Sequence, residues 1–358
     1  MQRFHAVSRG NHEYPSSQLP RMANAATKFR TELRVTIMPD PLLEVRNLEM
    51  YFAVRSGLLM RAKAYNKAVD NVSLTIHPGE TLGLVGESGC GKSTLGRCIL
   101  KLYAPNSGQV LFENSNITKL SSEGIMEYRK SVQMIFQDPM ESLNSRHTVN
   151  EILTEPFLIH NIGDREWRYK KVRNLLDIVG LPANAGRRYP FEFSGGQRQR
   201  IGIARAIALK PKLIVCDEAV SALDVSIQGQ IVNLLLDLQT EFNLSYLFIA
   251  HDLAIVKHIS DRIAVMYLGK IVELATSKTI YEKPKHPYTK LLIDSIPVPD
   301  PRQKREINLL QEDLPSSIDR PGGCAFHPRC SNALEKCQKI SPKIRHFSYQ
   351  HQYSCHLD

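Results

Sequence analysis

The feature that most constrains this fold is a glycine-rich stretch at residues 86–93, which reads GESGCGKS. It fits the phosphate-loop pattern G-x-x-x-x-G-K-[ST], and it lies between a predicted strand at 81–85 and a predicted helix at about 93–102. Amides at such a helix start bind phosphate oxygens, the lysine adds positive charge, and the serine hydroxyl reaches Mg²⁺. The sequence therefore predicts a nucleotide site. Its expected contacts are Gly86, Glu87, Ser88, Gly89, Cys90, Gly91, Lys92, Ser93 and Thr94.

Short apolar runs alternate with helical patterns along most of the chain. Such alternation predicts an α/β core. The expected strands are 72–76, 81–85, 110–112, 132–136, 213–216 and 244–249, and the expected helices are 93–102 and 227–242, with a mostly helical block at 149–179.

Candidate catalytic residues follow three of these strands. A buried strand that ends in two carboxylates, Asp217 and Glu218, is costly unless a cation or a reaction uses them. We expect Asp217 to hold Mg²⁺ through water and Glu218 to be the base that orients the attacking water. His251 follows the strand 244–249 and is expected to contact the γ-phosphate. Gln137, after the strand 132–136, is expected to sense that phosphate by reaching Mg²⁺ or the water.

A second glycine motif stands at Ser194, Gly195, Gly196 and Gln197, before a predicted helix. Its backbone N–H groups and serine hydroxyl would also suit an anion. Because the chain already has a complete phosphate loop, this second phosphate-binding site must either be redundant or bind another nucleotide.

An aromatic platform for the adenine is expected near the start of the organised sequence. Phe52 is favoured over its neighbour Tyr51, because a flat ring can stack on a base. Packing in the core is the alternative for this side chain.

Charge and hydropathy exclude some classes of function. The net charge is +10, but residues 1–37 hold six Lys/Arg against two Asp/Glu, so +4 of it lies there. A basic stripe with interleaved aromatic residues is not evident, and we expect no nucleic-acid partner. No apolar stretch approaches the roughly 20 residues that span a bilayer.

The pattern divides the chain into three parts. Residues 1–37 lack apolar periodicity and are expected to be a disordered basic arm or a misassigned start, since the organised pattern follows Met38. Residues 38–274 form the predicted ATPase domain, with a helical subdomain at about 139–200. Residues 275–358 form a separate loop-rich appendix, because nine of the twenty prolines fall in the last 75 residues.

Over about residues 42–274 the chain resembles the nucleotide-binding subunits of ATP-binding cassette (ABC) transporters, whose motifs occur here in the family's order. The resemblance implies a RecA-like mixed-sheet core with a helical subdomain, ATP and Mg²⁺ as ligands, and a head-to-tail dimer. In that dimer Ser194 and Gly196 would serve the partner's nucleotide, and Asp224 would lie at the interface. Lys92, Gln137, Glu218 and His251 would be the catalytic residues. The family usually has proline at the position of Ala219, but both carboxylates are present.

The sequence is more similar to the ATPase subunits of oligopeptide and dipeptide permeases. The segments QDPMESLN at 137–144, HPYT at 286–289 and GCAFHPRC at 323–330 carry this likeness, and Cys90 and Thr94 resemble the second of that group's two unlike ATPase subunits. The resemblance implies a peripheral protein on the cytoplasmic face of the cell membrane. It favours a heterodimer over a homodimer, two transmembrane permease subunits, and an indirect solute-binding partner outside the membrane.

Four cysteines crowd the appendix, namely Cys324, Cys330, Cys337 and Cys355. Their spacing is too loose for a zinc ribbon built on CxxC, yet four thiolates can converge on a metal. The permease resemblance favours a [4Fe-4S] cluster, with zinc and unmetallated thiols as alternatives. His327, His351 and His356 are rival ligands.

The predicted function is ATP hydrolysis that drives peptide import. An importer of nickel or another small solute is the alternative within the same class. A soluble cassette ATPase that acts on nucleic acid or ribosomes is the rival from another class, and an exporter ATPase is disfavoured by the HPYT segment.

Overall fold

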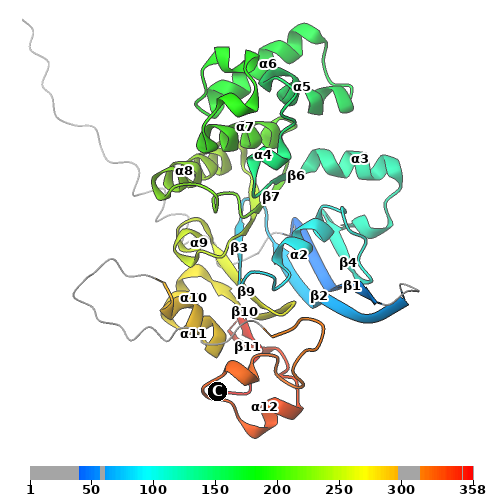
Figure 1. Ribbon diagram of the computed structural model, residues 1–358, viewed down its shortest axis with the longest axis vertical. Helices are drawn as coiled ribbons and strands as arrows, with labels where there is room; N and C mark the ends of the chain where they lie inside the picture. The colour runs from blue at the N-terminus through cyan, green and yellow to red at the C-terminus, as the bar shows by residue number, and fades with distance from the viewer. Residues whose placement is uncertain (1–39, 57–60, 297–314, 349, 358) are drawn as a thin grey trace, which may run out of the picture. The chain divides into compact units, whose positions relative to one another are not determined.

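Strands and helices alternate along the described residues of the computed structural model, which are 40–56, 61–296, 315–348 and 350–357 (Figure 1). They belong to one compact unit, from Asp40 to Asp358. The predicted α/β class is confirmed. The predicted arm at 1–37 lies outside the described residues.

The main sheet positions the nucleotide site. Within the described residues its strand order is β11 (Arg345–Ser348), β12 (His351–Tyr353), β10 (Lys270–Thr276), β9 (Arg262–Tyr267), β3 (Thr81–Val85), β8 (Ser245–Ile249), β7 (Leu213–Asp217) and β6 (Val132–Ile135). The inner strands β3, β7 and β8 are buried at every residue and run parallel, as expected for a sheet covered on both faces. Strands β9 and β6 continue the parallel part, whereas β10, β12 and β11 are added antiparallel.

A second, antiparallel sheet forms from the first part of the chain. Its order is β2 (Arg61–Ile76), β1 (Leu43–Ser56), β4 (Ser107–Phe112) and β5 (Ser115–Asn116). Strand β2 is much longer than the apolar run predicted at 72–76, and no strand was predicted at the position of β1. They have several register shifts and carry polar residues, so apolar content alone does not mark their full length.

Four helices pack near the strands: α2 (Lys92–Ile99), α3 (Ser122–Ser131), α8 (Val225–Phe242) and α9 (Leu253–Ile259). Between β6 and β7 the chain forms a group of helices. In Figure 1 these helices lie together, and the last of them, α7 (Gly195–Ile207), is nearest to β6 and β7. The helices of this group are α4 (Pro139–Ser142), α5 (Val149–Ile159), α6 (Arg165–Ile178) and α7. The predicted block at 149–179 is divided into two helices, because Asn161 and Gly163 adopt positive φ and Asp164 caps α6.

The sequence suggests a separate appendix, but the last part of the chain is attached to the main sheet through β12 and β11. It begins with α10 (Ser277–Glu282) and α11 (Pro287–Asp294) and ends with α12 (Glu335–Lys339), β11 and β12. The fully buried carboxylate of Glu273 on β10 accepts hydrogen bonds from the N–H groups of Lys285 and His286, and His351 Nε2 lies 2.7 Å from it. Glu273 therefore joins the sheet to both α11 and β12.

Candidate functional site

The phosphate loop follows β3 in a conformation that glycine permits. Gly86 and Gly91 have φ of 152° and 109°. A Cβ atom would lie 2.1 Å from the Met266 carbonyl oxygen at Gly86, and 1.9 Å from the Ala68 carbonyl oxygen at Gly91. The loop is thus pressed against β9 and β2, and only glycine fits at these two positions.

Lys92 is held inside this loop. Its side chain is buried, and its Nζ donates to the carbonyl oxygens of Gly86, at 2.7 Å, and Glu87, at 2.9 Å. These bonds place a compact positive charge at the helix start, where the dipole of α2 also favours an anion.

Ser93 and Asp217 meet although they are 124 residues apart. The Ser93 hydroxyl donates to the Asp217 carboxylate at 2.7 Å. Burial raises the pKa of Asp217, and the bond from Ser93 acts in the opposite direction. A hydroxyl and a buried carboxylate side by side are oxygen ligands of the kind that Mg²⁺ prefers, so these residues fit the predicted ion.

Glu218 and His251 also lie close together, at the ends of the neighbouring strands β7 and β8. His251 Nδ1 is 3.7 Å from a carboxylate oxygen of Glu218. Glu218 has a φ of 47°, and its N–H donates to the Ile249 carbonyl oxygen at 3.0 Å. A non-glycine residue in this conformation at a strand end is a feature found at active sites.

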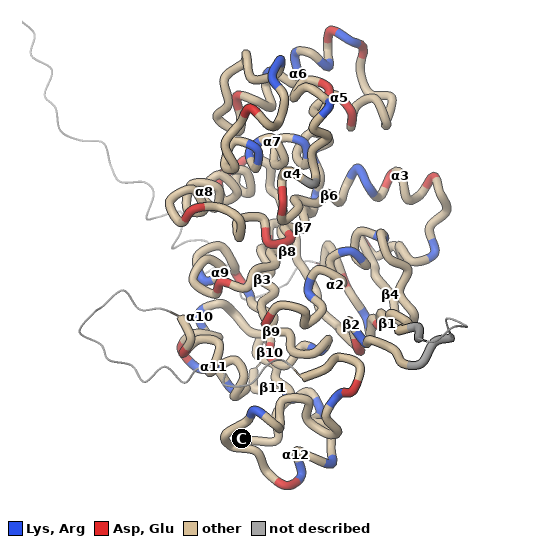
Figure 2. Tube along the Cα trace, viewed as in Figure 1, with Lys and Arg blue, Asp and Glu red and all other residues tan. Residues whose placement is uncertain are grey.

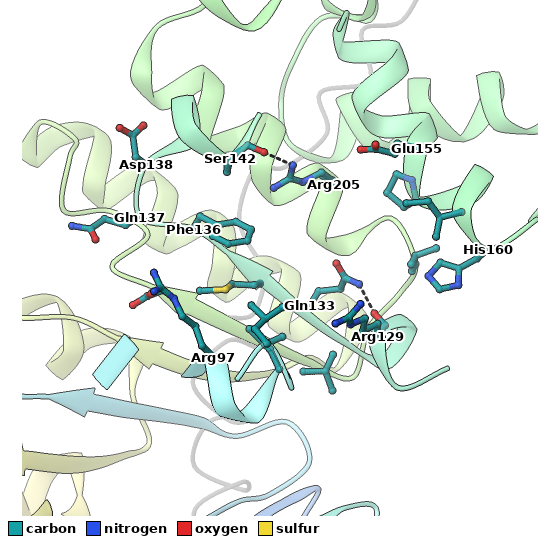
Figure 3. A pocket seen from close by; sticks show the side chains of 18 of the residues that line it. Arg97, Arg129, Gln133, Phe136, Gln137, Asp138, Ser142, Glu155, His160 and Arg205 are labelled. Carbon is teal, nitrogen blue, oxygen red and sulfur yellow. Dashed lines mark hydrogen bonds between the residues drawn. The ribbon is translucent and has the colours of Figure 1, made fainter. Parts of the chain in front are cut away.

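Gln137 lies at the edge of a groove of about 970 Å³ between α2 and the helical group. Figure 3 shows Gln137 and Asp138 at one end, with Arg97 below them, and Glu155 and His160 at the other end. Asp217 lines the same groove, so the expected phosphate sensor and the expected magnesium ligand share one space.

The second glycine motif forms the start of α7 and is exposed. Ser194 caps the helix by accepting from the Gln197 N–H, and the Gln197 side chain accepts from the Ser194 N–H in return. A Cβ at Gly196 would lie 2.6 Å from Ile227, so the motif is close to the start of α8. Asp224, the N-cap residue of α8, is exposed beside it, followed by Val225 at 84% exposure.

The two candidate adenine platforms differ in their partners. The Tyr51 hydroxyl donates to Asp70 at 3.3 Å, whereas the Phe52 ring packs edge-to-face on Tyr103, with 5.5 Å between centroids. Both rings are half-buried. The role of Phe52 therefore stays a prediction.

The four C-terminal cysteines line one small cavity, together with His286, His327 and His356. All four are free thiols, and burial raises the pKa of Cys324 to about 11. His351 is bonded to Glu273 instead. In the described part of the chain, no three His, Cys, Asp or Glu side chains are placed to hold a single metal ion.

Three residues at the site were not predicted from their own features. Arg97 lines the groove with Asp217 and lowers its pKa against the effect of burial. Tyr288 and Arg329 contact the phosphate loop from the C-terminal part of the chain. These two residues lie in the HPYT and GCAFHPRC segments, but the local sequence pattern does not indicate that they contact the phosphate loop.

A phosphate loop after β3, paired carboxylates at the end of β7 and an exposed Ser-Gly-Gly helix start define a cassette-type ATPase. Family models agree: "ABC transporter" matches residues 69–221, and "Oligopeptide/dipeptide transporter, C-terminal region" matches residues 272–337.

Known proteins narrow the class further. The chain is 52% identical over 321 residues to the oligopeptide transport ATP-binding protein AppF of Bacillus subtilis (strain 168), covering 89% of this chain and 98% of that protein. It is 48% identical to a probable peptide ABC transporter ATP-binding protein, y4tS, of Sinorhizobium fredii, and the match covers 89% of this chain and 91% of that protein.

Solved structures show the same fold. One is cbiO1 of Clostridium perfringens, part of the cbiONQ transporter complex (TM-score 0.58, 28% identity, covering 68% of this chain and 92% of that one). Another is a dimeric post-hydrolysis state of the cassette MJ0796 bound to ADP and phosphate (TM-score 0.59, 27% identity, covering 66% of this chain and 98% of that one). The chain belongs to the ABC transporter family, among the oligopeptide and dipeptide transport ATP-binding proteins, and it is an ATPase.

Proposed function

We propose that this chain is the ATPase subunit that powers import of oligopeptides or dipeptides, working at the cytoplasmic face of the cell membrane. The observation that carries the proposal is its C-terminal region, which matches that of peptide transporters and contacts the phosphate loop through Arg329. None of the helices in the described residues is long and apolar enough to span a bilayer. Transmembrane permease subunits would therefore supply the path for the solute.

Hydrolysis would rest on the strand ends. Glu218 would accept a proton from the attacking water, with His251 beside it. Lys92 would stabilise the charge on the phosphates. Ser93, Asp217 and Gln137 would hold Mg²⁺, which supplies charge neutralisation when bound.

The exposed Ser-Gly-Gly motif would act on a nucleotide held by another subunit. Ser194, Gly196 and Asp224 lie together at the adjoining starts of α7 and α8, and Val225 next to them exposes apolar surface that an interface would cover. The dimeric cassette MJ0796 supports this arrangement. We favour an unlike second ATPase subunit as the partner.

The groove in Figure 3 is the surface that would receive the permease. Exposed apolar side chains lie along it, among them Leu102, Phe136 and Ile159, and Arg129 and Arg205 add positive charge. Because Gln137 lines the same groove, a change at the γ-phosphate would reach a docked permease segment directly.

The four-cysteine cluster, Cys324, Cys330, Cys337 and Cys355, would hold a [4Fe-4S] cluster. The four thiolates would be its ligands, and the bound cluster would help to hold this loop-rich segment together. The support for one shared group is that all four cysteines line the same cavity. Iron, sulfide and zinc analysis after anaerobic purification tests it, and a colourless protein with stoichiometric zinc would contradict it.

Uptake by cells that lack this chain tests the transported solute. Wild-type protein should restore uptake of a radiolabelled tripeptide, and Glu218→Gln, expressed at the same level, should not. Labelled nickel and a labelled free amino acid serve as comparison solutes. Restored uptake of nickel without that of the tripeptide would contradict peptide import.

The partners are tested by purifying the tagged chain from detergent-solubilised membranes. We expect a second cassette ATPase and two membrane-spanning subunits. Figure 2 shows basic and acidic residues interspersed along the described residues, so ribosomes or DNA are not expected, and their recovery instead would refute the proposal.

A further inference from the structure

The C-terminal part of the chain reaches the phosphate loop through one buried ion pair. Arg329 Nη1 donates to both carboxylate oxygens of Glu87, at 3.1 and 3.0 Å, across 242 residues of sequence. The Arg329 side chain is 4% exposed and that of Glu87 20%. Burying two charges costs free energy, and their pairing with two hydrogen bonds offsets it only while the geometry is kept.

Glu87 is held at three points, and the third is the catalytic lysine. Its carboxylate binds Arg329, its N–H donates to the Tyr288 hydroxyl at 2.9 Å, and its carbonyl oxygen accepts from Lys92 Nζ at 2.9 Å. A shift of Glu87 would therefore move the ammonium group that meets the phosphates. Arg329 and Lys92 are linked through a single residue.

The backbone around Arg329 is fixed by its surroundings. Arg329 ends a 3-10 turn, His327–Arg329, directly before Cys330, and its N–H donates to the Phe326 carbonyl oxygen at 3.1 Å. The Phe326 ring is buried against Tyr267 and Tyr288, with 5.3 Å between centroids in each pair. Phe326 and Cys330 also line the cavity of the four-cysteine cluster. Arg329 is thus bonded to the phosphate loop and directly precedes a cysteine of that cluster.

We propose that Arg329 is a positioning residue of the nucleotide site. It holds Glu87 and, through the Glu87 carbonyl, Lys92, and it neutralises a carboxylate that would otherwise repel the phosphates of ATP. The fold of the C-terminal segment, residues 315–357, would in this way set the affinity for ATP. The inference concerns nucleotide binding and holds whichever solute is transported.

Equilibrium binding of ATP and ADP to the full chain, with thermal unfolding measured without nucleotide, tests the proposal. Arg329→Ala leaves Glu87 charged and unpaired, so we expect affinity to fall about tenfold. Adding Glu87→Gln removes that charge and should recover most of the loss. Arg329→Lys keeps a point charge but not the forked donor, and should give a two- to fivefold loss by the same reasoning.

Arg262→Ala is the matched control. It breaks the Arg262–Glu80 pair, at 3.0 Å and similarly buried, which lies at the end of β3 opposite the loop. We expect this variant to unfold at a lower temperature with unchanged nucleotide affinity.

Two outcomes would overturn the proposal. The first is an Arg329→Ala variant that binds ATP as tightly as the wild type. If the alanine variant does not fold, the same result for Arg329→Lys would overturn the proposal. The other is a double variant no better than Arg329→Ala, since the loss would then come from general disruption and not from the exposed charge of Glu87.

Discussion

The two helix starts that we propose to bind anions, those of α2 and α7, differ in how complete they are. At the start of α2, Lys92 is buried and Ser93 is half-buried, and both are already paired, Lys92 with carbonyl oxygens of its own loop and Ser93 with Asp217. At the start of α7 the polar groups of Ser194 and Gln197 are exposed, and their hydrogen bonds stay within the helix cap. The difference supports our proposal that the first site is built within one chain and that the second is completed by another.

The largest expected effect is at the first site. Glu218→Gln should lower ATP turnover about 100- to 10,000-fold, because the amide cannot accept the proton from water. ATP should still bind, and the assembled ATPase pair should stay closed on it, as size-exclusion chromatography with trapped nucleotide would show. Glu241→Gln, an exposed change on α8, is the control. Wild-type turnover by Glu218→Gln would refute the role of this residue.

A substitution at the second site should have a somewhat smaller effect on ATP turnover. Gly195→Asp puts a negative charge where the partner's phosphate would lie, and we expect ATP turnover of the assembled complex to fall about 100-fold. The added Cβ would have its nearest neighbour, Leu223, at 3.3 Å, and aspartate is favourable in the first turn of a helix, so the fold should persist. Gly229→Asp, at an exposed helical glycine with open space, should leave turnover unchanged. Equal losses in both variants would count against the proposed role.

The smallest effect concerns stability. Burial raises the folded-state pKa of Asp217 above its unfolded value, so the charged carboxylate destabilises the nucleotide-free protein at neutral pH. Asp217→Asn should raise the melting temperature at pH 7 by about 1 to 2 °C, while magnesium-dependent hydrolysis is lost.

The pH dependence of that gain provides a check. As pH falls from 7 toward 4, wild-type Asp217 takes up a proton in the folded state first, and the penalty disappears. The difference in melting temperature between the variant and the wild type should therefore shrink. A difference that grows on acidification would contradict the assigned cause.

Much of the first site was predictable because its determinants are local. The loop at 86–93 needs glycine at positions where a Cβ would meet backbone, and residues at the ends of adjacent parallel strands, such as Glu218 and His251, must come close together. The order of the motifs predicted the class, which the comparisons confirmed.

Contacts between distant segments were not predictable in the same way. The Arg329–Glu87 pair joins residues 242 positions apart, and neither residue type nor spacing identifies the partner. The long strands β1 and β2 were missed in part because they include polar residues and register shifts. The last strands join the sheet by pairing with β10, and the buried carboxylate of Glu273 adds contacts to His286 and His351, although Glu273 looks like an ordinary strand residue in the sequence.

The measurement that tests the comparison most directly is ATP binding by the isolated chain. Lys92→Ala removes the charge of the first site and should weaken the affinity for a fluorescent ATP analogue by about tenfold or more. Gly195→Asp should bind the analogue within about twofold of the wild type, because its glycine motif acts on another chain's nucleotide. A loss of affinity in Gly195→Asp as large as in Lys92→Ala would show that both helix starts hold the same nucleotide, and would contradict the account.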